Sequence, residues 1–172
     1  MNNILIKLYL FIYKKLFGSV SLARKLGVKI GEDCRLIGKV DFGSEPYLIE
    51  IGKHVSITTS SFVTHDGGVW VMRKENPKLD VIAPIKIGNN VFIGTSCIIL
   101  PGTIIGNNVV IGAGSIVKGN IESNSVYAGV PAKRIKPLKD YMNQCISIGI
   151  NTKGMRNKEA FIKDEFLSDR GE

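Results

Sequence analysis

The sequence predicts an all-β solenoid, a parallel β-helix in which three short strands make one turn of a triangular prism. Through the middle of the 172-residue chain an aliphatic residue falls on every sixth position, and glycine follows four of these seven residues. A period of six fits neither the 3.6-residue repeat of an α-helix nor a two-residue alternation carried through hairpins. The repeat residues are Val81, Ile87, Ile93, Ile99, Ile105, Ile111 and Val117.

Each six-residue unit is expected to form one wall of the prism. A repeat residue and the residue four positions later point inward, because even spacing keeps side chains on one face of a strand. The glycine after the repeat residue allows a positive φ or a close backbone approach at the corner, and asparagine suits the turn itself. The second inward position holds small or β-branched residues, namely Val91, Cys97, Thr103, Val109 and Ser115.

The same phase occurs upstream at Ile51, Ile57 and Val63. From Val63 to Val81 is one full coil in number, although the pattern itself is lost between them. We therefore expect a loop at about residues 65–84 that is extruded from the solenoid. The chain then divides into an N-terminal segment (1–29), a β-helix (30–136) and a C-terminal extension (137–172) with a short helix near residues 157–167.

The net charge of +8 is unevenly distributed, since residues 1–40 hold eight basic and two acidic side chains. This asymmetry indicates an N-terminal attachment surface and argues against a uniformly basic nucleic-acid-binding protein. The three cysteines form neither an even disulfide framework nor a metal-binding spacing, which favours a reducing, cytoplasmic location.

Residues 2–17 are rich in aliphatic and aromatic side chains, interrupted by Lys7, Lys14 and Lys15. The segment is too short and too charged to span a bilayer, and it lacks the cleavage site of a signal peptide. Two interpretations remain open. The segment is either a helix that caps the end of the solenoid, or an interfacial helix with its lysines directed at anionic head groups on the inner face of the membrane.

Four motifs resemble those of the hexapeptide-repeat acyltransferases. The similarity is greatest to the branch that contains the galactoside and maltose O-acetyltransferases and the O-acetyltransferases of bacterial surface polysaccharides. It implies a left-handed β-helix, a homotrimer with active sites between subunits, and acetyl-coenzyme A as the donor. The motifs are Ile-Gly-Asn-Asn-Val-Phe-Ile-Gly (87–94), Leu-Pro-Gly (100–102), Ile-Gly-Ala-Gly-Ser-Ile-Val (111–117) and Ala-Gly-Val-Pro-Ala-Lys (128–133).

The resemblance also assigns residues that would bind the coenzyme. Phe92 occupies the position where many relatives have tryptophan beside the coenzyme, and the backbone at Thr95 and Ala113 would hold the pantetheine arm. Lys133, with Arg134 after it, matches a basic position near the nucleotide phosphates. Relatives commonly read Val-Thr-Lys-Asp where this chain reads Val-Lys-Gly-Asn, so the lysine has moved by one residue, to Lys118.

His65 matches the catalytic histidine of the family and precedes the expected loop. Transfer of an acetyl group from a thioester to a hydroxyl needs a base, and the ordinary pKa of histidine suits that task near neutral pH. The other histidine, His54, lies beside a corner and is expected to face solvent. Direct attack without an acyl-enzyme is expected, because no cysteine or serine is paired with a base. Asp66 is a candidate either to orient the imidazole or to bind the acceptor.

Trp70 and Arg73 lie on the expected loop and are candidates for acceptor binding. An indole stacks on the face of a sugar, and a guanidinium binds a carboxylate or phosphate through two parallel hydrogen bonds. Packing of Trp70 against a neighbouring subunit is an equally good interpretation.

The function predicted from these features is acetyl-coenzyme A-dependent O-acetylation of a carbohydrate hydroxyl in surface polysaccharide synthesis. One alternative is N-acetylation of an amino-sugar nucleotide, although the chain shows no dedicated nucleotide-binding domain. Another is a non-catalytic β-helix that only binds. A zinc enzyme of the same architecture needs three histidines, and the chain has two, so no metal is expected.

Overall fold

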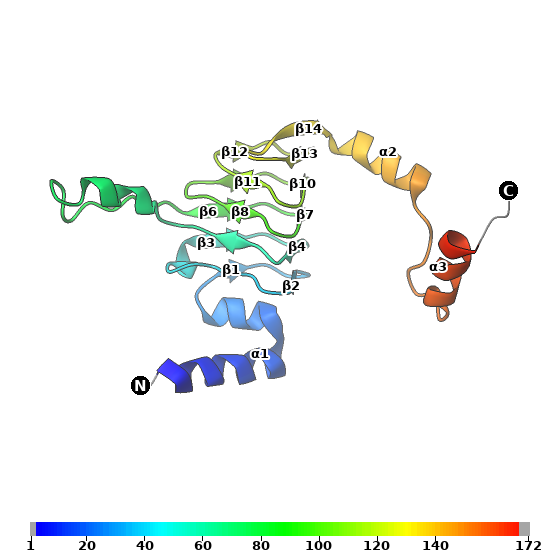
Figure 1. Cartoon of the computed structure of the whole chain (residues 1–172), viewed down its shortest axis with the longest axis horizontal. Coiled ribbons are helices and arrows are strands. Elements are labelled where there is room, and N and C mark those ends of the chain that lie inside the picture. The colour runs from blue at the N-terminus through cyan, green and yellow to red at the C-terminus, as the bar shows by residue number, and fades with distance from the viewer. Residues whose placement is uncertain (1–2, 169–172) are drawn as a thin grey trace. The chain divides into compact units, whose positions relative to one another are not determined.

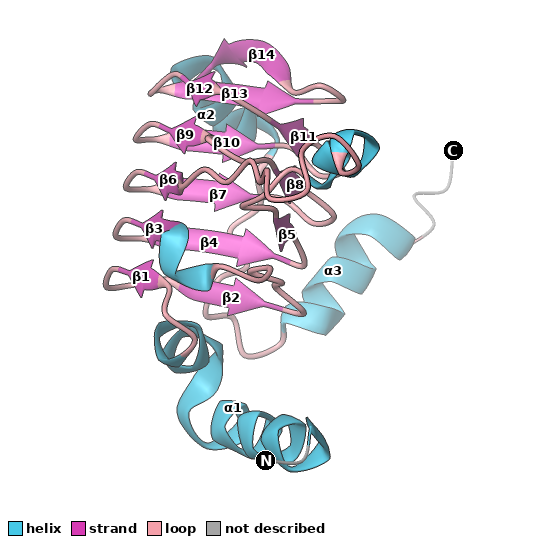
Figure 2. Ribbon diagram, turned by 90° about the vertical axis from the view of Figure 1, so that its left-hand side faces the viewer, coloured by secondary structure: helices cyan, strands magenta, loops and turns pink. Residues whose placement is uncertain are grey.

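The computed structural model describes residues 3–168 and contains a parallel β-helix of three sheets (Figures 1 and 2). Sheet A consists of β1 (Lys29–Ile30), β3 (Ile49–Ile51), β6 (Ile85–Ile87), β9 (Ile104–Ile105) and β12 (Asn120–Ile121). Sheet B consists of β2 (Arg35–Ile37), β4 (Val55–Thr58), β7 (Val91–Ile93), β10 (Val109–Ile111), β13 (Ser125–Ala128) and β14 (Lys133–Pro137). Sheet C consists of β5 (Ser61–Phe62), β8 (Ile98–Ile99) and β11 (Ile116–Val117).

Each coil of the chain passes through sheets A, B and C in turn and therefore makes three corners. We call the turn after a sheet A strand the first corner, the turn after a sheet B strand the second corner, and the turn after a sheet C strand the third corner. Neighbouring strands pair in parallel, except that β14 returns antiparallel to β13. The described residues up to Tyr141 and those from Met142 onward form two compact units, and the β-helix lies within the first.

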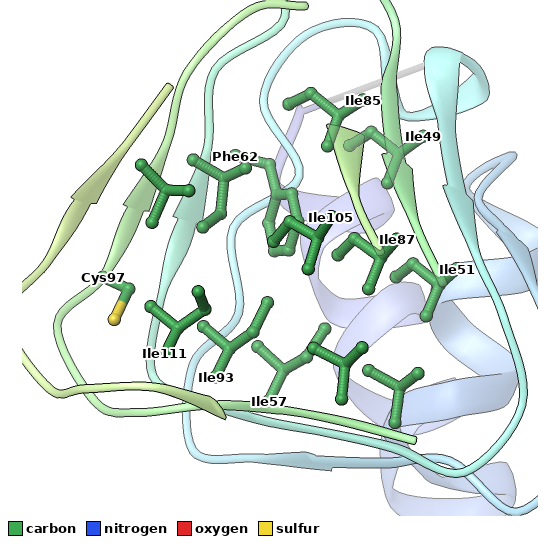
Figure 3. Close-up of a cluster of buried hydrophobic side chains, with 14 of the residues drawn as sticks. Ile49, Ile51, Ile57, Phe62, Ile85, Ile87, Ile93, Cys97, Ile105 and Ile111 are labelled. Atoms are coloured by element: carbon green, nitrogen blue, oxygen red, sulfur yellow. The ribbon is translucent and has the colours of Figure 1, made fainter. Parts of the chain in front are cut away.

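The interior of the prism is filled by stacked aliphatic side chains, as the six-residue period predicts (Figure 3). On sheet B, Ile57 pairs with Ile93 and Ile93 with Ile111, and all three side chains are fully buried. Thr103 and Ser115, at the predicted small inward positions, are also fully buried. Equivalent positions of neighbouring coils thus carry similar residues, which stack on one another. Each coil therefore contributes a similar layer to the core.

The first corner shows what the repeated glycine does. A Cβ at Gly88 would lie 2.7 Å from the carbonyl oxygen of Gly106 in the next coil, so the glycines permit close stacking of backbones. The positive φ falls two residues later, at Asn90 (55°) and Asn108 (57°), and the Asn90 Nδ2 donates to the Asn108 Oδ1 at 2.9 Å. His54 occupies the same position one coil earlier, with φ 55° and its Nδ1 2.9 Å from the Asn90 Oδ1, and it is solvent-exposed as expected.

Two of the expected wall positions are wrong. Phe62 and Thr64 point into the core in place of Val63, because this coil passes from Ile57 to the next wall in five residues where its neighbours use six. Val81 is half-exposed and belongs to the returning limb of the loop, not to a wall. The inserted residues therefore lie wholly outside the coil.

The extruded loop leaves the third corner and projects away from the prism (Figure 1, green). Its limbs are joined at the base, where the Asp66 amide donates to the Val81 carbonyl at 2.8 Å and the Ala83 amide donates to the Thr64 carbonyl at 2.9 Å. The outgoing limb forms a short 3-10 helix, η2 (Gly67–Met72). The base of the loop is thus held like a narrow hairpin.

The chain is not purely all-β, because it also forms α1 (Asn3–Lys25), α2 (Leu138–Ile148) and α3 (Lys158–Leu167). The N-terminal helix and the helix near residue 157 were expected, whereas α2 and the antiparallel β14 were not, since neither follows the six-residue period. α1 is kinked at Gly18 (φ 83°, ψ 168°), and the half after the kink packs Val20 and Ala23 against the core of the first coil. None of the helices formed by residues 3–168 combines the length and the apolar character that crossing a bilayer requires.

The close stacking at the first corner predicts that Gly88→Ala destabilises the protein. The added Cβ would meet backbone of the next coil, and such overpacking costs about 1–3 kcal/mol. Gly67→Ala is the matched control, since a Cβ there meets nothing within 4 Å. Urea unfolding of both variants at one protein concentration measures the difference; equal midpoints for the two variants would contradict this account of the repeated glycine.

Candidate functional site

His65 lies at the third corner, where β5 ends and the extruded loop begins. It forms an isolated antiparallel bridge with Ile82 of the returning limb. The preceding Thr64 is fully buried, and because side chains alternate along extended backbone, His65 points outward. Its side chain is 46% exposed, which leaves the imidazole accessible beside the base of the loop.

The imidazole is held by a carboxylate from the preceding coil. The Glu45 Oε2 lies 3.0 Å from the His65 Nδ1 and also accepts a hydrogen bond of 2.5 Å from the Thr64 Oγ1. The hydrogen bond from Thr64, and after it the one from His65, holds the pKa of Glu45 below its ordinary value of 4.5. An ionised carboxylate can only accept hydrogen bonds. The His65 Nδ1 therefore carries the proton, and in the neutral ring the Nε2 is left as a free acceptor.

The fold brings these side chains together through the stacking of two coils at the third corner. Phe42 and Phe62 are both buried, with ring centroids 5.3 Å apart, and they place the first coil directly beneath the second. Glu45 immediately precedes the short 3-10 helix η1 (Pro46–Leu48), and its carbonyl accepts from the Leu48 amide at 3.0 Å. This turn directs the side chain towards the coil above, where it is only 18% exposed.

Glu45 is not among the residues that the sequence pattern indicated. Asp66 was a candidate to orient the imidazole, but the Asp66 Oδ1 accepts from the Gly68 amide at 2.8 Å and caps η2. Glu45 is separated from His65 by 20 residues and lies in a stretch that departs from the six-residue period. The sequence offered one signal for this contact, namely an acidic residue in the irregular stretch one coil before the histidine.

The two loop residues expected to bind an acceptor differ in their surroundings. Trp70 is 77% exposed on η2, so its ring is available for contact. Arg73 is engaged within the loop: its Nη1 donates to the carbonyls of Pro77 and Leu79, and its Nη2 pairs with the Asp80 Oδ1 at 3.0 Å. Those contacts occupy the guanidinium that was expected to hold an acceptor.

Most of the residues assigned to the coenzyme lie along sheet B and the second corner. Phe92 projects outward from β7 and is 40% exposed. Thr95 and Ala113 are exposed in successive coils, linked by a 2.8 Å hydrogen bond from the Gly114 amide to the Thr95 carbonyl. An exposed aromatic ring beside a column of exposed small residues fits a pantetheine arm.

The two basic residues at the end of the same sheet extend this surface. Lys133 and Arg134 lie on β14, opposite Ala128 and Tyr127 of β13. Lys133 is exposed, and the Arg134 Nε is 3.6 Å from the Glu122 Oε2, a loose and mostly solvated ion pair. Cations at this point of the surface fit the phosphates of a nucleotide.

Lys118 does not join this group. It follows β11 and lies at the third corner, the corner from which His65 and the extruded loop emerge. Within one chain the whole width of sheet C therefore separates the histidine from the group at the second corner. In a single chain the residue expected to act as the base and the residues expected to bind the coenzyme therefore lie on different edges of the prism.

Neither a cysteine nucleophile nor a metal cluster is present at these corners. Cys97 is buried, and that burial raises the pKa of its thiol, which disfavours the reactive thiolate. In the described part of the chain, residues 3–168, no group of three or more His, Cys, Asp or Glu side chains could hold a metal ion.

Comparison with known proteins places this arrangement in a family. The bacterial transferase hexapeptide (six repeats) family matches residues 84–119. The chain is 46% identical over 169 residues to Protein CapG of Staphylococcus aureus, an alignment that covers 95% of this chain and 98% of CapG. It is 41% identical over 97 residues to the putative lipopolysaccharide biosynthesis O-acetyl transferase WbbJ of Escherichia coli K12, which covers 51% of this chain and 50% of WbbJ.

A solved structure shares the architecture. Galactoside acetyltransferase in complex with coenzyme A superimposes with a TM-score of 0.59 at 29% identity, over 80% of each chain. Together with the near full-length similarity to CapG, the repeat and the structural match show that the chain belongs to the hexapeptide-repeat acetyltransferases.

Proposed function

We propose that this protein is an acetyl-coenzyme A-dependent O-acetyltransferase that acts on a sugar hydroxyl during synthesis of a bacterial surface polysaccharide. The observation that carries the proposal is the exposed His65, whose Nδ1 is held by the ionised Glu45 at the base of the extruded loop. The similarity to an O-acetyl transferase of lipopolysaccharide biosynthesis supports this class of acceptor, and the similarity to an acetyltransferase that binds coenzyme A supports the donor.

In the proposed reaction, bound acetyl-coenzyme A supplies an activated acetyl thioester. His65 accepts the proton of the acceptor hydroxyl on its Nε2 as the oxygen attacks the thioester carbon. The C–S bond then breaks, and the protonated imidazole gives its proton to the sulfur, so that coenzyme A leaves as a thiol. Glu45 keeps the imidazole in the required tautomer and balances the positive charge that forms on the ring. The raised pKa of the Cys97 thiol supports direct transfer without an acyl-enzyme at that residue.

The coenzyme would lie along the second corner. Phe92 would pack against it, the backbone at Thr95 and Ala113 would bind its amide-rich arm, and Lys133 and Arg134 would bind its phosphates. Lys118 is more distant from this group in one chain, on the third corner. Asp66 at the base of the loop and Trp70 on its outgoing limb would bind the acceptor.

The assembly we propose is a homotrimer of left-handed β-helices with active sites between subunits. Its support is the separation of the two half-sites: a threefold arrangement of prisms brings the third corner of one chain to the second corner of the next. The loop adds a second argument, because Trp70 and Val71 are both largely exposed and apolar. Packing of the loop against a neighbouring subunit would cover them.

Replacement of the proposed base tests this function directly. We expect His65→Asn to lower turnover by about 10²–10⁴-fold, the usual contribution of a general base. The matched control is His54→Asn, because asparagine already occupies the equivalent corner position at residues 90, 108 and 124 with a positive φ. The assay is a screen of sugars, nucleotide sugars and oligosaccharide repeats, with coenzyme A release measured and products identified by mass. Near-normal turnover of the His65 variant would refute the assignment.

A second variant tests the role of Glu45. We expect Glu45→Gln to lower kcat by about 10- to 1,000-fold while the KM for acetyl-coenzyme A stays unchanged, because the amide no longer enforces the tautomer or balances charge on the imidazole. Glu50→Gln, which removes a solvent-exposed ion pair with Lys29, is the control and should retain full activity. If both variants are equally active, Glu45 does not position the base.

The lowered pKa of Glu45 also predicts a pH dependence of stability. A carboxyl group with a depressed folded-state pKa stabilises the native state above its ordinary pKa, and that contribution is lost as the pH falls through the folded-state value. The unfolding free energy of the wild type should therefore approach that of Glu45→Gln as the pH is lowered below 4.5, the ordinary pKa of the group. Urea unfolding of both proteins between neutral pH and pH about 3 measures the difference; a pH-independent difference would contradict the ionised state.

A further inference from the structure

We propose that the half of α1 before Gly18 binds the surface of a bilayer that contains anionic lipid. This inference goes beyond the acetyltransferase function and does not depend on it. It rests on three features of the helix: one face is already packed on the protein, another face is apolar and exposed, and all its charges are positive.

The inner face of this half-helix is attached to the rest of the molecule. Ile6, Leu10 and Tyr13 follow helical spacing and are half-buried. The Lys25 Nζ, from the half after the kink, lies 5.4 Å and 4.9 Å from the ring centroids of Tyr9 and Tyr13. The helix is therefore held against the cap of the solenoid, and its outer face is presented in a defined direction.

The outer face is largely apolar, with Lys15 beside Phe11 at the i+4 position. Leu5, Leu8, Ile12 and Leu16 follow at intervals of three and four residues, which places them on one side of the helix. Each of these side chains is at least 46% exposed, and the neighbouring Phe11 is 65% exposed. Exposed apolar patches of this extent mark an interaction site in a folded protein.

The charges of α1 indicate which kind of partner binds this apolar surface. Residues 3–25 contain no aspartate or glutamate, and their five charged side chains are the cations Lys7, Lys14, Lys15, Arg24 and Lys25. Two copies of the same face would bring lysine against lysine with no carboxylate between them, which opposes self-association through it. A layer of anionic head groups over hydrocarbon complements both the lysines and the apolar side chains.

The position of the helix is compatible with membrane contact during catalysis. α1 lies beyond β1 and β2, at the end of the prism opposite β14 (Figure 1). α1 contacts the second corner in the first coil, where the Lys14 Nζ donates to the Gly38 carbonyl, whereas His65, Thr95 and Ala113 lie on later coils. Binding through α1 would therefore hold the protein at a membrane without blocking either proposed half-site.

Vesicle flotation of the full chain tests the inference. The wild type should float with phosphatidylcholine vesicles that contain phosphatidylglycerol, should not float with phosphatidylcholine alone, and should be released at high salt. We expect Phe11→Glu to lower the partition coefficient by about tenfold or more, because it removes an exposed aromatic side chain that would be buried in the bilayer on binding. Lys7→Gln combined with Lys15→Gln should also lower it. Ile146→Glu, which places the same charge at an exposed apolar position on α2, is the matched control and should float like the wild type.

Circular dichroism and retained acetyl transfer establish that each variant is folded. Failure of the wild type to float, or equal flotation of the Phe11→Glu variant, would overturn the inference. Sedimentation velocity identifies the rival occupant: if Phe11→Glu dissociates an oligomer and the wild type does not bind vesicles, the face binds a second copy of the chain.

Discussion

The close stacking of one coil on the next is the constraint on which the rest of the structure depends. Paired strands lie about 4.8 Å apart, and at the first corner a side chain of any size would meet the backbone of the neighbouring coil. Glycine at that point in the first four coils, and a residue with a positive φ two positions later (asparagine in the last three coils), allow the coils to turn in the same way. Once the corners of successive coils superimpose, the isoleucines of each wall superimpose as well. The packing of the core is therefore determined by the geometry of the corners.

The same constraint decides which way His65 faces. If Val63 occupied the wall position that the period assigns to it, two-residue alternation would direct His65 into the core. The coil instead reaches sheet C one residue early, so that Phe62 and Thr64 point inward and His65 points outward. The displaced threonine is then close enough to hydrogen-bond Glu45 together with the histidine. A one-residue departure from the repeat thus creates the arrangement on which the proposed chemistry depends.

This departure also explains how much the sequence could predict. The walls, the buried small residues, the loop and the histidine at its base follow from a local period, because each unit repeats the same geometry. Glu45 could not be found in this way, since its contact depends on the stacking of two coils in a stretch without periodicity. The engagement of Arg73 within the loop depends equally on the loop's own turn. The antiparallel return of β14 ends the solenoid by a pairing that the repeat does not encode.

A solenoid with a filled interior leaves only its corners and insertions for chemistry. The walls of this prism are flat, and their inward side chains leave no room for a ligand inside. The proposed base at the third corner and the proposed coenzyme surface at the second corner cannot meet within one chain, because sheet C lies between them and the coils cannot rotate relative to one another without breaking their ladders. The corners of two different chains can be brought together without breaking the hydrogen bonds between coils. The rigidity that makes the repeat stable is therefore also the physical reason to expect an active site that is completed only by a neighbouring subunit.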